Sequence, residues 1–567
     1  MFGENMGKFS NYIDSQFFII DSNDLNNIHS ELFGFSLVDG KIFYNHNLND
    51  DIKLDGEGTY IRILRKKNSV EISQDLNGCY GIFMYTYEDN FVISNSFLKL
   101  TEYLVDKYPI SINTDVLLSY LPANLCAIQY KETMINEIEI IPRNYIINID
   151  IPTKTLDFKI LPLDDSTISI DSIEGIKLLD EWFYKWVSIF RSIALETNNF
   201  EVDLSGGFDS RVVLTVLLNS QINLNKIRVY SKFNPENPSE DYEIASTIAN
   251  KFNFKLNGPI NKKLVWVDNI EDSINLAYYI RLCNHKHFGF ARAISQYPVY
   301  VTGGYCGERL KDYYLLTPQE YTKMCVERAE RFSKEFKDPT QRVLDKSFSR
   351  LQKEWNIEDK NSKYLTQLLL KEAENRNHFG KMSVGFYLTN QIRLSPLCDQ
   401  KLYKFKNEGD LLFALIFTRY CPELLDIKFD KKKFIKEHVK NKAKEINEKY
   451  PFELKKFDYI DGANEDLNKD YITEKQTKVI APEKFVEDVF RSESFKNTFN
   501  TYFSPNVYQK IIEDVENAGY QPLSLVNCSF AMLKMINLAR INNEILSNNP
   551  MKWLDNFLEI KNFSSNS

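Results

Sequence analysis

The chain has 567 residues, more than one hydrophobic core of ordinary size organises, so we expect at least two domains. Hydrophobic residues make up 43% of it and aromatic residues 14%, which supplies a buried interior and excludes a disordered chain. The formal net charge of -8 at pH 7 argues against a nucleic-acid partner, since proteins that bind nucleic acids usually carry a basic footprint.

Cysteine usage and the first residues of the chain both predict a cytoplasmic protein. The eight cysteines are scattered, and none of them forms a CxxC pair or stands at zinc-finger spacing from a histidine. Isolated cysteines suit a reducing compartment. The N-terminal segment carries Glu4 and Asp14, unlike a signal peptide, and no run approaches the ~18–20 apolar residues of a membrane helix. We therefore expect no membrane partner.

Residues 1–165 are predicted to form a β-rich domain. Short β-prone segments such as Leu37–Phe43 alternate with turn signals such as Asp39-Gly40 and Asp55-Gly56. The segment Asp75–Ser96 is predicted to be a hairpin, because two runs of β-branched and aromatic residues flank a tight turn at Glu88–Asn90. The polar, proline-containing stretch Ile160–Asp171 marks the expected domain boundary.

Residues 166–567 are predicted to alternate helix with strand and then to become mainly helical after about residue 310. Ile173–Ala194 and Asp209–Asn219 have apolar residues at helical spacing. Strands that alternate with helices favour a doubly wound parallel sheet. Its four strands are predicted at Phe200–Leu204, Ile227–Ser231, Leu264–Val267 and Pro298–Thr302.

The most informative string is FEVDLSGGFDSRVVLTVLL, because ligands of open α/β sheets bind beyond the carboxyl ends of the strands. Gly206 and Gly207 allow an anion to approach the backbone, and the following helix adds the favourable end of its dipole. Ser205 and Ser210 can add hydroxyl donors, and Asp209 is expected to hold a Mg²⁺ ion that bridges to phosphate oxygens. No Gly-Lys-Ser/Thr closes the loop, so it is not of the Walker type.

The order of strand, SGGFDS and apolar helix resembles the PP-loop ATP pyrophosphatases, most closely the asparagine synthetase and β-lactam synthetase group, whose motif is SGGxDS. The resemblance loosely covers residues 1–400, and the string SGGFDSR is its specific part. It implies that ATP binds with its β,γ-phosphates in this loop. The implied nucleotide-binding residues are Leu204, Ser205, Gly206, Gly207, Phe208, Asp209, Ser210, Ser231 and Gly304.

A second glycine-rich string, VYVTGGYCGERL, stands where this family carries an acidic loop. Glu308 falls where the family has an aspartate that binds Mg²⁺, so the implied metal ligands are Asp209 and Glu308, the latter one methylene longer than the family residue. Tyr305 falls where β-lactam synthetases carry a catalytic tyrosine. The resemblance makes Tyr305 and Glu308 the candidate catalytic residues, with Tyr305 as a base whose pKa a metal or nearby cation lowers. A packing aromatic is the alternative for Tyr305.

Three further features are attached to the same resemblance. The segment Arg393–Leu402, RLSPLCDQKL, resembles the family's R-x-PxxD segment near the nucleotide. Arg376 and His378 are candidates to face the cleft, with a structural role as the alternative for the histidine. The family also uses a late lysine to stabilise the transition state, and the choice stays open among Lys428, Lys431, Lys432 and Lys433.

The N-terminal string LNGCYGIFMYTYED resembles the LNGxFAFxxxD strand pair of the asparagine synthetase glutaminase domain. That domain needs a cysteine directly after the initiator methionine, whereas this chain has Phe2, which cannot attack an amide. Cys79 lies within the predicted hairpin and is expected to be a small core residue. The implied architecture is a degenerate Ntn-hydrolase-like αββα sandwich over residues 1–165 and a PP-loop synthetase domain over residues 166–567.

The resemblance implies an ATP-dependent amide ligase that releases AMP and pyrophosphate, in specialised-metabolite or surface-glycan biosynthesis. It would adenylate a small-molecule, peptide or sugar carboxylate and couple it to an amine or ammonia, with ATP and Mg²⁺ as cofactors and a homodimer as the candidate assembly. Two alternatives stay open: a protein that has lost catalysis and binds or scaffolds, and another PP-loop adenylation such as nucleobase modification or thiolation. A tRNA partner predicts a basic surface and thiolation predicts paired cysteines, and the sequence has neither.

Overall fold

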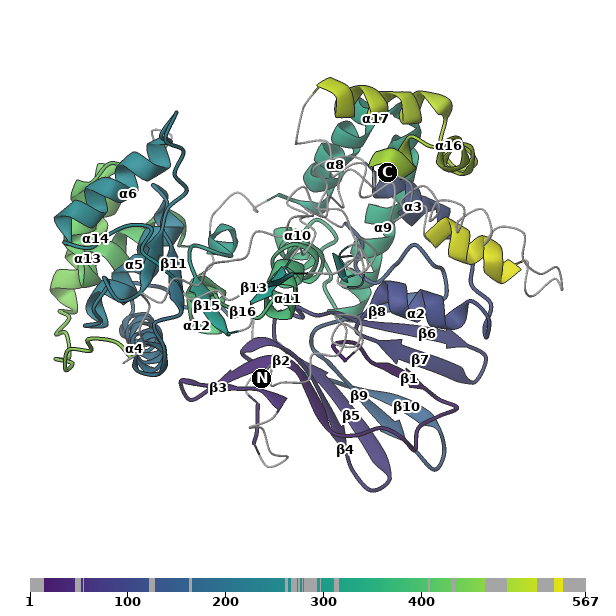
Figure 1. Ribbon diagram of the computed structural model, residues 1–567, viewed down its shortest axis with the longest axis horizontal. Coiled ribbons are helices and arrows are strands. Elements are labelled where there is room, and N and C mark those ends of the chain that lie inside the picture. Colours follow the sequence, from purple (N-terminus) through teal and green to yellow (C-terminus); the bar gives the residue numbers. More distant parts are fainter. Residues whose placement is uncertain are drawn as a thin grey trace.

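The structure, a computed structural model, places two antiparallel sheets and a helical cap beside a parallel sheet with its own helices (Figure 1). It describes residues 15–45, 52–54, 56–121, 128–162, 166–260, 264–266, 273, 276–277, 279, 293–295, 297–310, 316–405, 408–430, 434–463, 487–517 and 535–543. Within these ranges it leaves out the side chains of residues 264–266, 293, 308, 309, 374, 375, 378 and 514–517.

The N-terminal part folds into two antiparallel sheets. The first sheet has the order β1 (Ile19–Asp21), β7 (Asn90–Ser94), β6 (Ile82–Tyr87) and β8 (Ile138–Ile141). The second sheet has the order β10 (Thr155–Ile160), β9 (Tyr145–Asp150), β5 (Ser69–Gln74), β4 (Gly58–Arg65), β2 (Glu31–Val38) and β3 (Lys41–Phe43).

The two sheets share one apolar core, to which strands of both contribute buried side chains. In β5, for example, Val70 and Ile72 are buried while their neighbours are partly exposed. The predicted β6–β7 hairpin is confirmed. The turn predicted at Asp39–Gly40 is confirmed: it joins β2 to β3 in a hairpin, and the two residues have the positive φ angles of 49° and 75° that a two-residue turn requires.

The parallel sheet has the order β12 (Arg228–Tyr230), β11 (Phe200–Asp203), β15 (Val299–Thr302) and β16 (Gln391–Leu394). All three strand pairs are parallel. The chain places β12 on one side of β11 and β15 on the other, so the strand order reverses between β11 and β15. Ligands of open parallel sheets bind outside the carboxyl edge at such a reversal.

Membership of this sheet corrects one prediction. Residues 264–267 were expected to supply its third strand, but β13 (Leu264–Trp266) pairs antiparallel with β14 (Ala293–Ser295) in a separate two-stranded sheet. The remaining strand of the parallel sheet is β16, whose sequence QIRL is too short and too polar to show a strand pattern. Its place depends on pairing with β15, a contact distant in sequence.

Helices cover the parallel sheet and continue into a helical cap over the first antiparallel sheet (Figure 1). The predicted helix from Ile173 is confirmed, with Ser172 as its N-cap. Around the parallel sheet lie α4 (Ile173–Glu196), α5 (Phe208–Asn219), α6 (Glu240–Lys251), α12 (Gln400–Tyr403), α13 (Gly409–Tyr420) and α14 (Glu437–Lys449), with the short turns η2 (Gly307–Leu310), η6 (Pro396–Cys398) and η7 (Pro422–Asp426).

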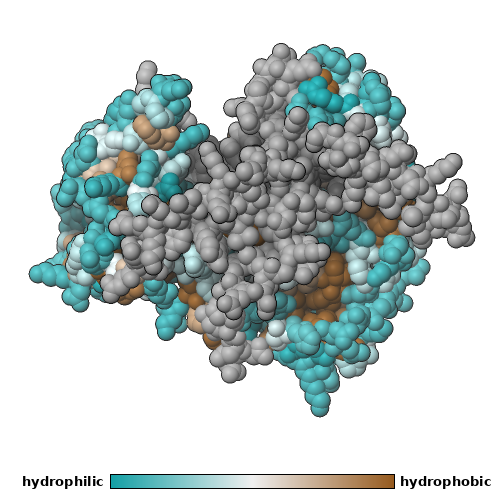
Figure 2. Space-filling model, viewed as in Figure 1, coloured by the Kyte–Doolittle hydropathy of each residue, from teal (hydrophilic) through white to brown (hydrophobic). Residues whose placement is uncertain are grey.

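The cap helices pack on the face of the first sheet that lies away from the second sheet. They are α2 (Phe97–Leu104), α3 (Thr114–Ser119), α8 (Pro318–Phe332), η4 (Lys334–Phe336), α9 (Lys337–Glu354), α10 (Lys363–Leu369), the wide π-helix η5 (Leu370–Gly380), α16 (Glu493–Phe499) and α17 (Pro505–Asn517). The helix α11 (Lys381–Leu388) instead contributes Val384 and Leu388 to the core between the two sheets. None of the helices in the described ranges is both long and apolar enough to cross a bilayer. Figure 2 shows mainly hydrophilic side chains on the described parts of one face, with hydrophobic ones gathered toward the N-terminal sheets.

Candidate functional site

The SGGFDS string forms the connection between β11 and α5, at the carboxyl edge of the parallel sheet. The N-cap of α5 is Gly207, and no side chain caps the helix in the part of the chain that the structure describes. The first backbone N–H groups of a helix have no partner within the helix, and its dipole favours negative charge there. An uncapped helix start after a glycine turn is therefore a suitable anion site.

Hydrogen bonds within the loop hold it in one shape. The Ser205 N–H donates to Oγ of Ser210 over 3.1 Å, and the two hydroxyls lie 3.0 Å apart. The Gly207 N–H donates to Oγ of Ser205 over 3.3 Å. The two serines, predicted as donors to a ligand, thus also bind each other and the backbone.

The outer side of the loop packs against α6 and the chain after η7. The Gly206 N–H donates to the Asp241 carboxylate over 2.9 Å. A methyl group on Gly206 would lie 2.8 Å from Cδ1 of Ile244 and 3.0 Å from Cβ of Asp430, so a larger residue here would require these side chains to shift. The sequence predicted the loop but not Asp241 or Asp430, which reach it from distant segments.

Arg211 fixes the carbonyl side of the same loop. Its guanidinium donates to the backbone oxygens of Gly206 and Ile427 and stacks 3.9 Å from the centroid of the Phe429 ring. Burial lowers the pKa of Arg211 to about 10, and the Asp430 carboxylate opposes that shift. The residues 424–430 are thereby attached to the loop, which no local pattern in the sequence indicated.

The second glycine-rich string, which follows β15, packs directly on Asp209. A methyl group on Gly304 would lie 2.7 Å from Cβ of Asp209, and one on Gly307 would overlap the Asp209 carboxyl group. The structure therefore brings the two predicted loops together around Asp209. Glu308 follows Gly307 directly in η2, but its side chain lies outside the described residues.

The described side chains contain no group of three histidine, cysteine or acidic residues that could hold a metal ion. Mg²⁺ in nucleotide sites commonly uses one or two protein carboxylates and completes its shell with phosphates and water. Asp209 and the position of Glu308 fit that smaller requirement.

Tyr305 lies at the strand-order reversal, where its phenol donates a hydrogen bond to the Asp203 carboxylate at the end of β11. The Arg393 guanidinium lies 3.4 Å from the centroid of the Tyr305 ring and 4.2 Å from that of Phe386. Burial raises the pKa of Tyr305 above its usual range and Asp203 adds to the shift, although Arg393 opposes it. Among the described protein groups Arg393 alone lowers this pKa, as expected of a nearby cation, and burial outweighs it.

The other predicted nucleotide residues divide into two groups. Leu204 is buried in the core, and Phe208 packs on Phe429 with ring centroids 4.3 Å apart, so both have structural contacts. Ser231 directly follows β12, and its backbone is bound to Asn257. Its hydroxyl is buried and has no hydrogen-bond partner among the described residues, which leaves it available to a ligand.

Arg376 does not face this site, which corrects the expectation. It lies buried in η5 and donates to the carbonyl oxygens of Ile141 and Tyr130. The side chain of His378 lies outside the described residues. Of the candidate lysines, Lys428 forms an ion pair with Glu240 over 3.5 Å, and residues 431–433 are outside the described residues.

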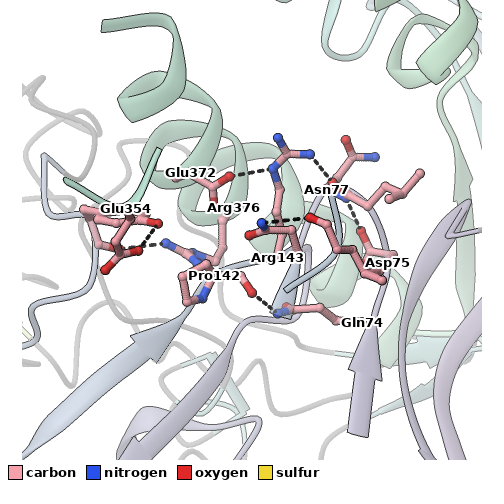
Figure 3. A network of polar contacts seen from close by, with 12 residues as sticks. Gln74, Asp75, Asn77, Pro142, Arg143, Glu354, Glu372 and Arg376 are labelled. Carbon is pink, nitrogen blue, oxygen red and sulfur yellow. Dashed lines mark hydrogen bonds and ion pairs between the residues drawn. The ribbon is translucent and has the colours of Figure 1, made fainter. Parts of the chain in front are cut away.

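The LNGCYG loop lies between the N-terminal sheets and η5 (Figure 3). Cys79 is buried, as predicted, and its backbone N–H donates to Asp75. Figure 3 shows Arg143 reaching Glu372 of η5, and Nε of Arg143 lies 2.6 Å from Oε1 of Glu372. Arg143 also donates to the carbonyl oxygen of Leu76 over 2.7 Å. The loop therefore serves as a contact between the two halves of the chain, and Phe2 lies outside the described residues.

Comparison with known proteins gives no family assignment. No family model matches the chain, and no curated protein matches it significantly. The function is therefore inferred from the residues and contacts described above.

Proposed function

We propose that the protein is an ATP-dependent amide ligase that releases AMP and pyrophosphate, built from a degenerate glutaminase-like sandwich and a PP-loop synthetase domain. The observation that carries the proposal is the position of Asp209. It lies in the first turn of the uncapped helix α5, and the glycines of the second loop pack on its side chain at the strand-order reversal. The substrates are a small-molecule, peptide or sugar carboxylate and an amine. A cytoplasmic location, a homodimer and the absence of nucleic-acid and membrane partners stay predictions.

In this proposal the N–H groups at the start of α5 bind phosphate oxygens, and the Ser231 hydroxyl is a further polar contact for the nucleotide. Asp209 and Glu308 would hold Mg²⁺, which supplies positive charge to the leaving pyrophosphate. The substrate carboxylate attacks the α-phosphorus of ATP and displaces pyrophosphate, and the amine then displaces AMP. The protein contributes mainly the orientation of the reacting groups.

The amine must lose a proton in the second step. With its raised pKa, Tyr305 keeps its own proton at neutral pH, so it can accept the amine proton only by giving up the proton that it already holds. Its phenol already donates to Asp203. We assign Tyr305 the role of passing the proton to the Asp203 carboxylate, which replaces the predicted role of Tyr305 as the base.

One observation favours the second candidate, a protein that has lost catalysis. The N–H of Gly206 donates to Asp241, and Asp430 packs beside the same glycine. A phosphate in the loop would lie near these carboxylates, and a protein that no longer binds ATP would tolerate them.

Pyrophosphate release distinguishes the two candidates. The protein is incubated with ATP, Mg²⁺ and pools of carboxylates and amines, and Asp209→Asn is compared with Asp345→Asn, which changes an exposed acid of α9. We expect release that depends on a carboxylate and is lost in Asp209→Asn alone. Absence of both release and ATP binding in the unsubstituted protein would favour the protein without catalysis.

A further inference from the structure

A cavity of about 50 Å³ lies between the second antiparallel sheet and the carboxyl end of β16. Its walls include Gly58 and Thr59 of β4, Cys306 of the second glycine loop, and Arg393 and Ser395 at the end of β16. The N-terminal half and the parallel sheet therefore build this space together. The cavity adjoins the surroundings of Tyr305, because Arg393 lines the cavity and stacks on the Tyr305 ring.

Arg393 has donors that the protein does not use. Its exposed fraction is 5%, and its Nε and Nη1 atoms have no hydrogen-bond acceptor among the described residues. The rings of Tyr305 and Phe386 contact the flat face of the guanidinium and hold it in place. A guanidinium stays charged when buried, and buried donors without acceptors cost free energy. An anion in the cavity would remove that cost.

The acidic residues of the cavity wall are already neutralised. Lys185 forms an ion pair with Asp399 over 3.0 Å and a second one with Glu57. The Trp186 ring N–H also donates to Asp399, over 2.8 Å. Both carboxylates thus have a cationic partner, so a bound cation would fit this cavity poorly. Among the described charged residues of the wall, Arg393 has N–H donors without an acceptor.

We propose that this cavity binds a carboxylate group, anchored by Arg393. Each buried water occupies about 10–15 Å³ of such space, so 50 Å³ accommodates roughly three to five waters or a group the size of acetate. Arginine recognises planar carboxylates well, because its N–H groups form a fixed fork. The hydroxyls of Ser383 and Ser395 in the wall supply further donors. The site is separate from the ATP loop and does not require the proposed ligase activity.

Isothermal titration calorimetry of the full chain with acetate tests the proposal, with acetamide as the neutral analogue of the same shape. We expect saturable binding of acetate and none of acetamide. Arg393→Gln should weaken acetate binding about ten- to a hundredfold, the loss expected when hydrogen bonds to a charged group are removed. Arg342→Gln, which changes an exposed arginine bound to Asp115, should leave it unchanged.

Arg393 is buried, so each variant is first checked for an unchanged melting temperature. Ser383→Leu keeps the charge of Arg393 but fills the cavity, and it should also abolish acetate binding. Hexanoate is titrated in parallel: binding equal to acetate indicates the end of a longer substrate, and binding of acetate alone indicates a free small carboxylate. Equal affinity for acetate and acetamide, or undiminished binding in both cavity variants, overturns the proposal. Because no ATP is present, such a failure would leave the ligase proposal standing.

Discussion

At the scale of single residues, burial decides how the neighbouring groups Tyr305 and Asp203 can handle a proton. The phenol of Tyr305 is buried and donates to Asp203, and both features raise the pKa of Tyr305. The sequence identified Tyr305 from its position in the second glycine loop. It gave no sign of Asp203, because one acid in the strand FEVD is not distinguishable from a solvent-facing residue until the strand is placed in the sheet.

Tyr305→Phe removes the hydroxyl and keeps the ring that Arg393 contacts. We expect amide formation to fall about a hundredfold or more, since positioned proton transfer contributes that much, while carboxylate-dependent pyrophosphate release persists. Amide product is measured by mass spectrometry beside Tyr459→Phe, a change at an exposed tyrosine. Full amide formation in Tyr305→Phe would remove this residue from the mechanism.

Asp75, which directly precedes the LNGCYG loop, is fully buried, and burial raises its pKa from 3.8 to about 6. The folded protein therefore keeps a proton on Asp75 at pH values where the unfolded chain has lost it. Its contribution to stability is largest below about pH 4, falls as the pH rises to about 6, and is constant above that. The fall is on the order of 3 kcal/mol.

Asp75→Asn should remove this fall. Urea unfolding midpoints of both proteins are measured between pH 4 and pH 7, and the difference between them is followed, which cancels the contribution of other groups. The stability of the variant relative to the unsubstituted protein should rise with pH across this window. A difference independent of pH would show that Asp75 does not titrate there.

At the scale of elements, two glycines of the second glycine loop differ in what an added side chain would meet. A methyl group on Gly304 would lie 2.6 Å from the backbone nitrogen of Ser210, which cannot move without distorting α5. A methyl group on Gly307 would meet only the Asp209 side chain among the closest atoms, and a side chain can rotate. Substitution of Gly307 therefore tests the position of Asp209 more cleanly than substitution of Gly304.

Gly307→Ala should displace the Asp209 carboxylate. We expect pyrophosphate release to fall at least tenfold with a loss of no more than about 1–2 kcal/mol in the free energy of unfolding. Gly258→Ala is the matched control, because a methyl group there would lie 3.8 Å from its nearest neighbour, the carbonyl oxygen of Ile227. Undiminished release in Gly307→Ala would show that the carboxylate position is unimportant.

Elements with a local pattern were predicted well. The β6–β7 hairpin and α4 follow from strand alternation and helical spacing, which neighbouring residues determine. The errors concern pairing at long range. A strand pattern at residues 264–267 does not say which sheet the strand joins, and β16 has no pattern of its own.

At the scale of the whole molecule, the contact between the N-terminal sheets and η5 uses buried charges. Arg143 and Glu372 are both nearly inaccessible, and Lys381, which follows η5 at the start of α11, donates to the carbonyl oxygen of Tyr80. These residues lie up to 301 positions apart. The sequence could suggest the LNGCYG loop as a remnant of a glutaminase, but not that it contacts η5, since no pattern links such distant segments.

A double-mutant cycle measures this contact. Arg143→Met alone should lower the free energy of unfolding by about 3–5 kcal/mol, because the Glu372 carboxylate stays buried after it loses the Arg143 guanidinium as its ion-pair partner. Adding Glu372→Leu removes the buried charge and should restore most of the loss. Urea unfolding of the two single variants and the double variant gives the coupling, and additive losses would contradict a buried ion pair.

The candidate site shows the same limits of sequence reasoning. Asp209, Tyr305 and Gly304 were predicted from two glycine-rich strings, and the structure brings them together. The residues that complete the surroundings come from segments with no motif. They are Asp203, Arg211, Asp241 and Asp430.

Exchange of labelled pyrophosphate into ATP tests the central proposal most directly, because it reports the reversible transfer of AMP to a carboxylate and needs no amine. The full chain is incubated with ATP, Mg²⁺, labelled pyrophosphate and a carboxylate that supports pyrophosphate release. We predict exchange that requires the carboxylate, is lost in Asp209→Asn and is kept in Asp345→Asn. Formation of ADP and phosphate in place of exchange, or equal exchange in Asp209→Asn, would contradict adenylation at this loop.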